Sequence, residues 1–177
     1  MTPARRALFF AAAGGVAAAA GYGFHRWLGT PAASSNNDPV AAILASRLTT
    51  LDSAVQSLSA FSGRVLVINY WATWCGPCRE EIPIFVRLQR DYGNQGLQFI
   101  GIAIDQADKV RGFAAEFRIN YPLLLGGMEA IELSRRAGNK AGVLPYTLVI
   151  DRSGRMVAGL AGGISEAGLR AQLTPLL

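Results

Sequence analysis

The chain has 177 residues, of which 51% are hydrophobic, and a formal net charge of +5. This length suits one globular domain with an appendage. Three of the 17 basic residues, Arg5, Arg6 and Arg26, belong to an apolar N-terminal segment, and the other 14 nearly balance the 12 acidic residues. A nearly neutral domain without basic clusters interleaved with aromatics gives no basis for a nucleic-acid partner.

The N-terminus carries the features of an export signal. Arg5 and Arg6 precede an uncharged apolar run over residues 7–24, and this order of charge and apolar residues is typical of export. As a helix, the 18-residue run would span about 27 Å at about 1.5 Å per residue, close to a hydrocarbon core of about 30 Å. We therefore predict a signal or anchor segment over residues 1–28 that stays in the membrane and leaves the domain outside the cytoplasm.

Two alternatives for this segment remain open. Ala18-Ala19-Ala20 is an A-x-A-like cleavage site behind a shorter apolar core, and cleavage there would release a soluble protein. The Arg5-Arg6 pair also suggests the twin-arginine export route as an alternative to the ordinary Sec route, although the flanking residues fit an ordinary basic n-region better. Each route brings the chain's cysteines into an oxidising compartment, where they form a disulfide unless something keeps them reduced.

The rest of the chain is predicted to be a linker over residues 29–39 and one α/β domain over residues 40–177. Proline, serine and asparagine concentrate in the linker, which favours turns and extended chain. Strands and helices then alternate, which indicates a mixed central sheet with the last two strands antiparallel. In chain order we expect a helix over 40–45, a hairpin over 47–57, a strand over 65–70, a helix over 76–92, a strand over 97–104, a helix over 106–118, an extended piece over 121–125, a helix over 129–137, strands over 146–151 and 156–160, and a helix over 166–176.

Cys75 and Cys78 are the only cysteines, and they lie where the apolar strand gives way to the next helix. A C-x-x-C pair at this place in a βαβ pattern is a redox motif. Cys75 would be the helix N-cap, where free N–H groups and the helix dipole stabilise a thiolate. Cys78 lies one turn further on, close enough to attack a mixed disulfide. Pro77 fits the first turn, where its missing N–H costs nothing.

Three other interpretations of the cysteine pair compete with redox catalysis. A zinc site needs four ligands, and the one histidine, His25, lies in the N-terminal segment. A purely structural disulfide across two residues restricts the unfolded chain very little. A Cu(I)-binding dithiol module stays open, because thiolates are soft ligands. We expect catalysis by the cysteine pair itself, with no metal site and no bound cofactor.

Two stretches resemble one known family. Residues 66–83, centred on Trp74-Cys75-Gly76-Pro77-Cys78, resemble the active site of the thioredoxin superfamily, and more narrowly of the TlpA/ResA-like membrane-associated periplasmic thiol–disulfide oxidoreductases. Residues 142–151 resemble that family's cis-proline loop and the strand after it. The resemblance implies a thioredoxin fold with an N-terminal hairpin extension. It also implies a cis Leu144–Pro145 bond facing the cysteines, with substrate pairing to the Leu144 backbone. The predicted substrate-binding residues are Trp74, Gly76, Pro77, Leu144 and Pro145.

Glu81 is the predicted proton acceptor of the site. Cytosolic thioredoxins carry a buried aspartate where this chain has Asn69, which does not titrate in the useful range. Cys75, Cys78 and Glu81 are spaced three apart and share one helix face, whereas Glu80 is turned away. An acidic active-site residue stands at the same place in the resembling proteins. We predict a partly buried carboxyl group with a raised pKa; the alternative is a solvated acid near the helix N-terminus.

The resemblance also implies the reaction and its partners. We expect a thiol–disulfide oxidoreductase facing the periplasm and held in the bacterial inner membrane by residues 1–28, as a monomer. It would reduce protein disulfides, such as haem-attachment cysteines of c-type apocytochromes or thiols of copper-site assembly proteins. Because the compartment is oxidising, its electrons would come from a membrane thiol carrier. A disulfide oxidase or isomerase of the same fold is the alternative.

Overall fold

The computed structural model describes residues 38–177, so the predicted anchor and most of the predicted linker lie outside the described residues. The first described helix, α2 (Pro39–Ala45), begins at the last residue of the predicted linker. Asp38 caps it by accepting a hydrogen bond from the Val40 amide at 2.9 Å, and Pro39 occupies the first turn, where its missing N–H costs nothing. Within residues 38–177, no helix is long and apolar enough to cross a membrane.

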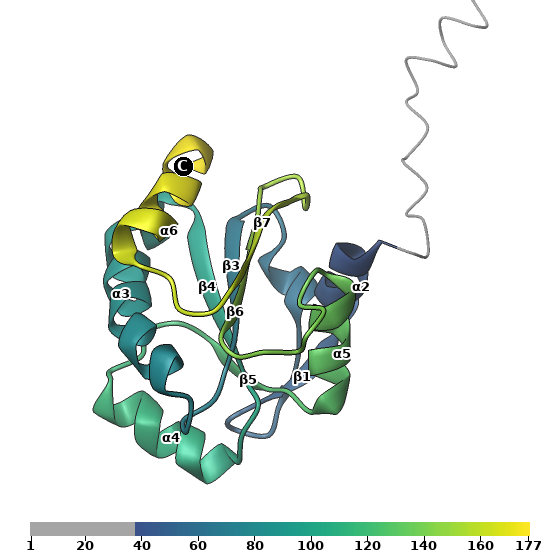
Figure 1. Cartoon of the computed structure of the whole chain (residues 1–177), viewed down its shortest axis with the longest axis vertical. Helices are drawn as coiled ribbons and strands as arrows, with labels where there is room; N and C mark the ends of the chain where they lie inside the picture. The colour runs from purple at the N-terminus through teal and green to yellow at the C-terminus, as the bar shows by residue number, and fades with distance from the viewer. Residues whose placement is uncertain (1–37) are drawn as a thin grey trace, which may run out of the picture. The chain divides into compact units, whose positions relative to one another are not determined.

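A mixed seven-stranded sheet forms the centre of the described residues, in the order β2-β1-β5-β4-β3-β6-β7 (Figure 1). The central strand β3 runs parallel to β4 and antiparallel to β6, and β6 pairs antiparallel with β7 as predicted. These pairings confirm the α/β class and the mixed sheet. The strands are β1 (Arg47–Thr50), β2 (Val55–Ser57), β3 (Val65–Trp71), β4 (Leu97–Ala103), β5 (Leu123–Leu125), β6 (Tyr146–Ile150) and β7 (Met156–Ala161).

Helices cover both faces of this sheet, which is why all seven residues of β3 and of β4 are buried. One core layer takes side chains from α3, α4 and α6, including Phe85, Phe113 and Leu169. The other layer takes side chains from α2 and α5, including Ile43 and Ala130. The remaining helices are α3 (Gly76–Tyr92), α4 (Ala107–Glu116), α5 (Met128–Arg136) and α6 (Glu166–Leu173), with single 3-10 turns η1 (Leu58–Phe61), η2 (Gly93–Gln95) and η3 (Thr174–Leu176).

The β1–β2 hairpin has a larger part in the sheet than the sequence indicates. Its strands pair antiparallel, and β1 also pairs antiparallel with β5 through Thr49 and Leu125. The hairpin therefore does not simply precede the core of the fold; it extends the central sheet at one edge.

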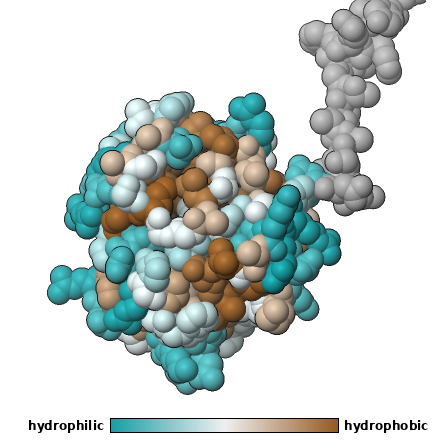
Figure 2. Space-filling model, viewed as in Figure 1, coloured by the Kyte–Doolittle hydropathy of each residue, from teal (hydrophilic) through white to brown (hydrophobic). Residues whose placement is uncertain are grey.

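The surface seen in Figure 2 is mixed, with apolar areas bordered by polar residues. Among the described residues, the most exposed large apolar side chains include Met128 at 76% and Trp74 at 68%. Trp71 and Tyr70, by contrast, are each 1% exposed and are therefore packing residues. Trp71 packs against Phe113 of α4 with ring centroids 5.1 Å apart.

Candidate active site

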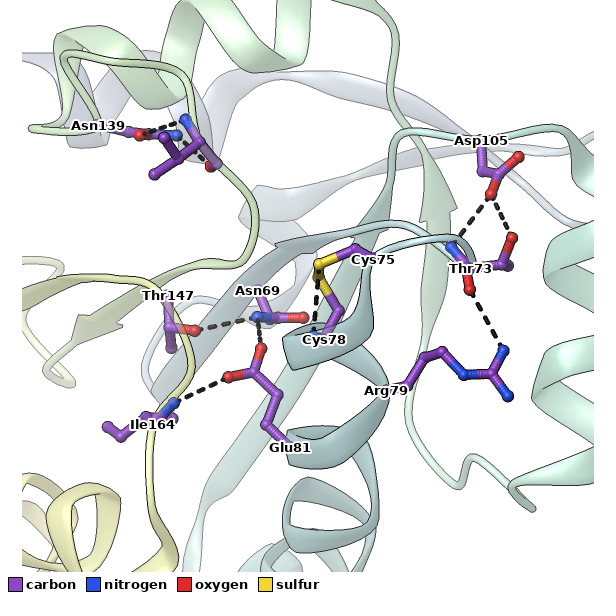
Figure 3. The surroundings of a disulfide bond; sticks show 11 residues. Asn69, Thr73, Cys75, Cys78, Arg79, Glu81, Asp105, Asn139, Thr147 and Ile164 are labelled. Carbon is purple, nitrogen blue, oxygen red and sulfur yellow. Dashed lines mark hydrogen bonds between the residues drawn. A yellow bond between two sulfur atoms is a disulfide. The ribbon is translucent and has the colours of Figure 1, made fainter.

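The cysteine pair lies at the start of α3 and forms a Cys75–Cys78 disulfide (Figure 3). Cys75 is the N-cap of α3, as predicted, and its Sγ accepts a hydrogen bond from the Cys78 amide at 3.4 Å. Cys75 retains 6% exposure whereas Cys78 is fully buried. Cys75 is therefore the sulfur that a partner reaches more easily, which agrees with its predicted role as the attacking thiolate.

Local sequence explains why the pair lies there. The apolar run of β3 ends at Trp71, and a turn closed by the Cys75 amide and the Ala72 carbonyl at 3.2 Å leads into the helix. Gly76 and Pro77 are exposed in the first turn, where proline's fixed φ suits a helix start. The Cys75 side chain thus stands at the positive end of the helix dipole.

The predicted cis-proline loop forms the second part of the site. The Leu144–Pro145 bond is cis, as predicted. Leu144 packs against the core cluster that contains both cysteines, and Pro145 is buried. Among the described residues, no hydrogen bond engages the backbone of Leu144. Its N–H and C=O groups are free to pair with an extended segment, as strand addition requires.

Asn139 holds this loop in place, a role that the sequence analysis missed. Its Nδ2 donates to the Val143 carbonyl at 3.0 Å and to Ser134 Oγ at 3.1 Å, and its Oδ1 accepts from the Val143 amide at 3.0 Å. The side chain is 2% exposed. The one available sequence signal was the Gly138-Asn139 pair, which favours a turn after a helix.

Glu81 lies deeper in the protein than predicted, with 1% exposure. Figure 3 shows its carboxyl group directed from α3 toward Asn69 of β3 and the backbone of Ile164. Oε1 accepts from Asn69 Nδ2 at 2.8 Å, and Oε2 accepts from the Ile164 amide at 3.2 Å. Burial raises the pKa of Glu81 more than these two hydrogen bonds lower it, so the pKa is about 7. The pKa of Glu81 is thus shifted in the predicted direction, whereas Glu80 is exposed.

Asn69 does not act as a base, but it positions the Glu81 carboxyl group. Besides its bond to Glu81, Asn69 Nδ2 donates to Thr147 Oγ1 on β6 at 3.0 Å. The amide is 2% exposed and fixes the orientation of the Glu81 carboxyl group. A polar row across β6, β3 and α3 thus lies beneath the site.

The glycine-rich segment after Met156 is closely packed at Gly159. Gly159 lies within β7, and a Cβ atom there would stand 2.4 Å from the hydroxyl oxygen of Tyr146. A glycine is required here because of close packing rather than because of backbone conformational freedom. Gly162 also has a defined place, since its amide donates to the Pro145 carbonyl at 2.9 Å.

A cleft of about 320 Å³ separates the start of α3 from the segment that follows β7. Glu81 contributes to its wall, so the cleft lies next to this buried residue. Within residues 38–177, no group of three or more His, Cys, Asp or Glu side chains is placed to hold a metal ion. The residues that line the cleft are Pro77, Glu80, Glu81, Ile84, Gly163, Ile164 and Ser165.

The sheet order, the N-cap cysteine and the cis-proline loop are those of a thiol–disulfide oxidoreductase with the thioredoxin fold. The family model described as Redoxin matches residues 31–173, and the chain belongs to that family.

Proteins with similar sequences or structures carry names that describe the same class. The thiol:disulfide interchange protein HelX of Rhodobacter capsulatus is 32% identical over 122 residues, which is 65% of this chain and 62% of HelX. The thiol-disulfide oxidoreductase ResA of Geobacillus kaustophilus is 28% identical over 127 residues, 71% of each chain. A crystal structure of a thiol:disulfide interchange protein from Chlorobium tepidum is similar with a TM-score of 0.67 and 29% identity, covering 74% of this chain and 92% of that one. The chain thus aligns with less than two thirds of HelX.

Proposed function

We propose that the protein reduces disulfides of other proteins outside the cytoplasm. The observation that carries this proposal is the position of Cys75, at the N-cap of α3 with a fully buried Cys78 one turn behind it. The helix N-terminus stabilises a Cys75 thiolate, and the thiolate is the nucleophile in disulfide exchange. HelX, ResA and the Chlorobium protein carry names that describe this class of reaction.

The reaction consists of two exchanges. The Cys75 thiolate attacks one sulfur of the substrate disulfide, forming a mixed disulfide while the other substrate sulfur leaves and takes a proton. Cys78 loses its proton and attacks the Cys75 sulfur, so the second substrate thiol leaves and the Cys75–Cys78 disulfide forms. Two electrons and two protons pass to the substrate, with the cysteine pair as the redox group in place of a bound cofactor.

Glu81 is the group proposed to take the proton from Cys78. Cys78 is fully buried, so its thiol has little direct access to water. A carboxyl group with a pKa of about 7 accepts and returns protons near neutral pH. The cleft that Glu81 lines offers the route by which the proton exchanges with solvent.

The partners follow from the compartment. In an oxidising compartment the pair needs a reductant, and we propose a membrane thiol carrier as the donor. We propose protein substrates that present an extended segment to Leu144 and an apolar contact to Trp74, which is 68% exposed. Apocytochrome haem-attachment cysteines and thiols of copper-site assembly proteins are the two substrate classes suggested by the family resemblance.

The direction of electron flow is tested by the reduction potential. Equilibration of the purified protein with glutathione buffers should give a potential at or below roughly −200 mV, where the dithiol is a useful reductant. Insulin disulfides, mixed with the reduced protein, should then be cleaved. A potential near roughly −120 mV, typical of strong oxidants, would contradict the reducing direction and favour the oxidase alternative.

The membrane anchor is tested by fractionation. Full-length protein should sediment with membranes and resist extraction by high salt, because an apolar helix over residues 7–24 is held by lipid rather than by charge. A shortened chain beginning at Ser34 should be recovered in the soluble fraction with its thiol chemistry intact. A mature N-terminus at Gly21, found by N-terminal sequencing, would show instead that the segment is a cleaved signal.

A further inference from the structure

The loop that carries Trp74 and Cys75 is attached to the start of α4 through Thr73 (Figure 3). Asp105 follows β4, and its Oδ2 accepts hydrogen bonds from the Thr73 amide at 3.1 Å and from the Thr73 hydroxyl group. Its Oδ1 accepts from the Gln106 amide at 2.8 Å. Because both carboxylate oxygens are engaged, the side chain cannot rotate without losing contacts.

Arg79 holds the remaining polar group of Thr73. Its Nη1 donates to the Thr73 carbonyl at 3.3 Å. The guanidinium carbon lies 5.0 Å from the ring centroid of Phe113 and 5.6 Å from that of Phe117, distances at which a cation is attracted to an aromatic face. The amide, hydroxyl and carbonyl groups of Thr73 are therefore all bound by charged side chains.

We propose that Asp105 is a positioning residue for disulfide exchange, which fixes Thr73 and thereby sets the place of Cys75 Sγ at the α3 N-terminus. Thr73 lies two residues before Cys75, inside the turn closed by the Ala72 carbonyl. Stabilisation of an anion by a helix N-terminus falls off within the first turn. A loop released from Asp105 therefore holds the Cys75 thiolate less favourably and presents Trp74 less consistently to a substrate. This inference rests on the proposed function.

The charge of Asp105 and its positioning role have opposite effects on the pKa of Cys75. A nearby carboxylate opposes formation of a thiolate, so loss of the charge alone would lower the pKa of Cys75. Loss of the hydrogen bonds would raise it, because the sulfur leaves its stabilising position. Burial raises the pKa of Asp105, but hydrogen bonds from Thr73 and Gln106 and the charge of Lys109 bring it below the usual value. The carboxylate is thus ionised and forms strong, charge-assisted hydrogen bonds.

The test compares three variants of the full-length chain: Asp105→Ala, Asp105→Asn and, as a control, Asp108→Ala. Asp108 is an exposed acid in the first turn of α4 that pairs with Arg111 rather than Thr73, so its loss removes a similar charge without releasing the loop. The other charged groups of the site, Arg79, Glu80 and Glu81 on α3 and Lys109 on α4, stay unchanged. The readouts are the pH profile of iodoacetamide alkylation of the reduced protein and the rate constant for insulin reduction.

For Asp105→Ala we expect a higher pKa of Cys75 and a rate constant lower by about tenfold or more, since small misplacement of reacting groups is costly. Asp105→Asn keeps an acceptor for Thr73 and should recover to within about threefold of the parent. Asp108→Ala should match the parent. A lowered pKa of Cys75 in Asp105→Ala, or a profile like that of Asp108→Ala, would overturn the proposal.

Two further variants keep the proposal testable if Asp105→Ala does not fold. Thr73→Val removes the hydroxyl donor, and Thr73→Ser keeps it. Thr73→Val should raise the pKa of Cys75, whereas Thr73→Ser should leave this pKa unchanged. Identical alkylation profiles for the two variants would contradict the positioning role of Asp105. A purely structural role would lower the unfolding temperature without moving the alkylation profile. Alkylation needs no protein substrate, so it tests Asp105 even if insulin is not reduced and the proposed function fails.

Discussion

Replacing Cys75 by serine should abolish disulfide reduction, lowering the rate constant on the order of a thousandfold or more. A serine hydroxyl group does not ionise near neutral pH, so the helix N-terminus has no anion to stabilise and no nucleophile remains. The measurement is insulin reduction by the dithiothreitol-reduced variant after removal of the reductant. Urea unfolding of the variant, compared with that of the parent protein, serves as the control that the variant is folded.

Replacing Cys78 by serine should give the opposite signature, a mixed disulfide that persists. Cys75 still attacks, but no second thiol is present to release the partner. Membranes that contain the Cys78→Ser variant should yield a covalent adduct that is visible on a non-reducing gel and lost with reductant. The double variant Cys75→Ser/Cys78→Ser is the control and should trap nothing. Adducts with Cys75→Ser and none with Cys78→Ser would reverse the two roles and show that Cys78, rather than the N-cap residue Cys75, is the attacking thiolate.

Replacing Glu81 by glutamine should slow disulfide reduction by about tenfold to a hundredfold near neutral pH, within the range of a lost proton acceptor. Glutamine cannot take the Cys78 proton, so the inflection that we expect near pH 7 in the rate profile of the parent should be absent from that of the variant. Glu80→Gln is the matched control, because Glu80 is exposed on the same turn of α3. Equal profiles for Glu81→Gln and the parent would end the proposal for Glu81.

The same carboxyl group should link folding to pH. Its pKa rises from 4.5 to about 7 on folding, so between these values the native state holds a proton that the unfolded state has lost. The resulting stability is fully present below about pH 4.5 and is lost as the pH rises through about 7. The loss amounts to about 3 kcal/mol, at about 1.36 kcal/mol per pKa unit.

Urea unfolding of the oxidised protein across this pH range measures that loss. The parent should become less stable as the pH rises, and Glu81→Gln should show a much flatter dependence. Both oxygens of Glu81 accept hydrogen bonds from N–H donors, on Asn69 and Ile164. Glutamine offers only one acceptor oxygen, so the free energy of unfolding of the Glu81→Gln variant is lower than that of the parent at every pH. The slope against pH, rather than the absolute value, is therefore the decisive quantity. A parent protein that gains stability between pH 5 and 7 would contradict the raised pKa.

The sequence by itself determined the strand, the cysteine pair and the helix that follow one another from Val65 to Tyr92. This was predictable because its signals are local: an apolar run buried on both faces, an N-cap position, and a proline in the first turn. The spacing of three also placed Glu81 on the face of Cys78, since helical periodicity is local too. The cis bond before Pro145 came from the family resemblance rather than from any such rule.

Only the tertiary structure decided which distant groups meet at the site. Glu81 bonds to the amide of Ile164, 83 residues away in the chain, and Asn69 bonds to Thr147, 78 residues away. Asp105 reaches Thr73 across 32 residues, and β1 joins the sheet through β5. Such contacts depend on the order of strands in the sheet and on how loops close over it. Residue patterns with periods of two or 3.6 specify which face is buried, but not which partner lies across from it.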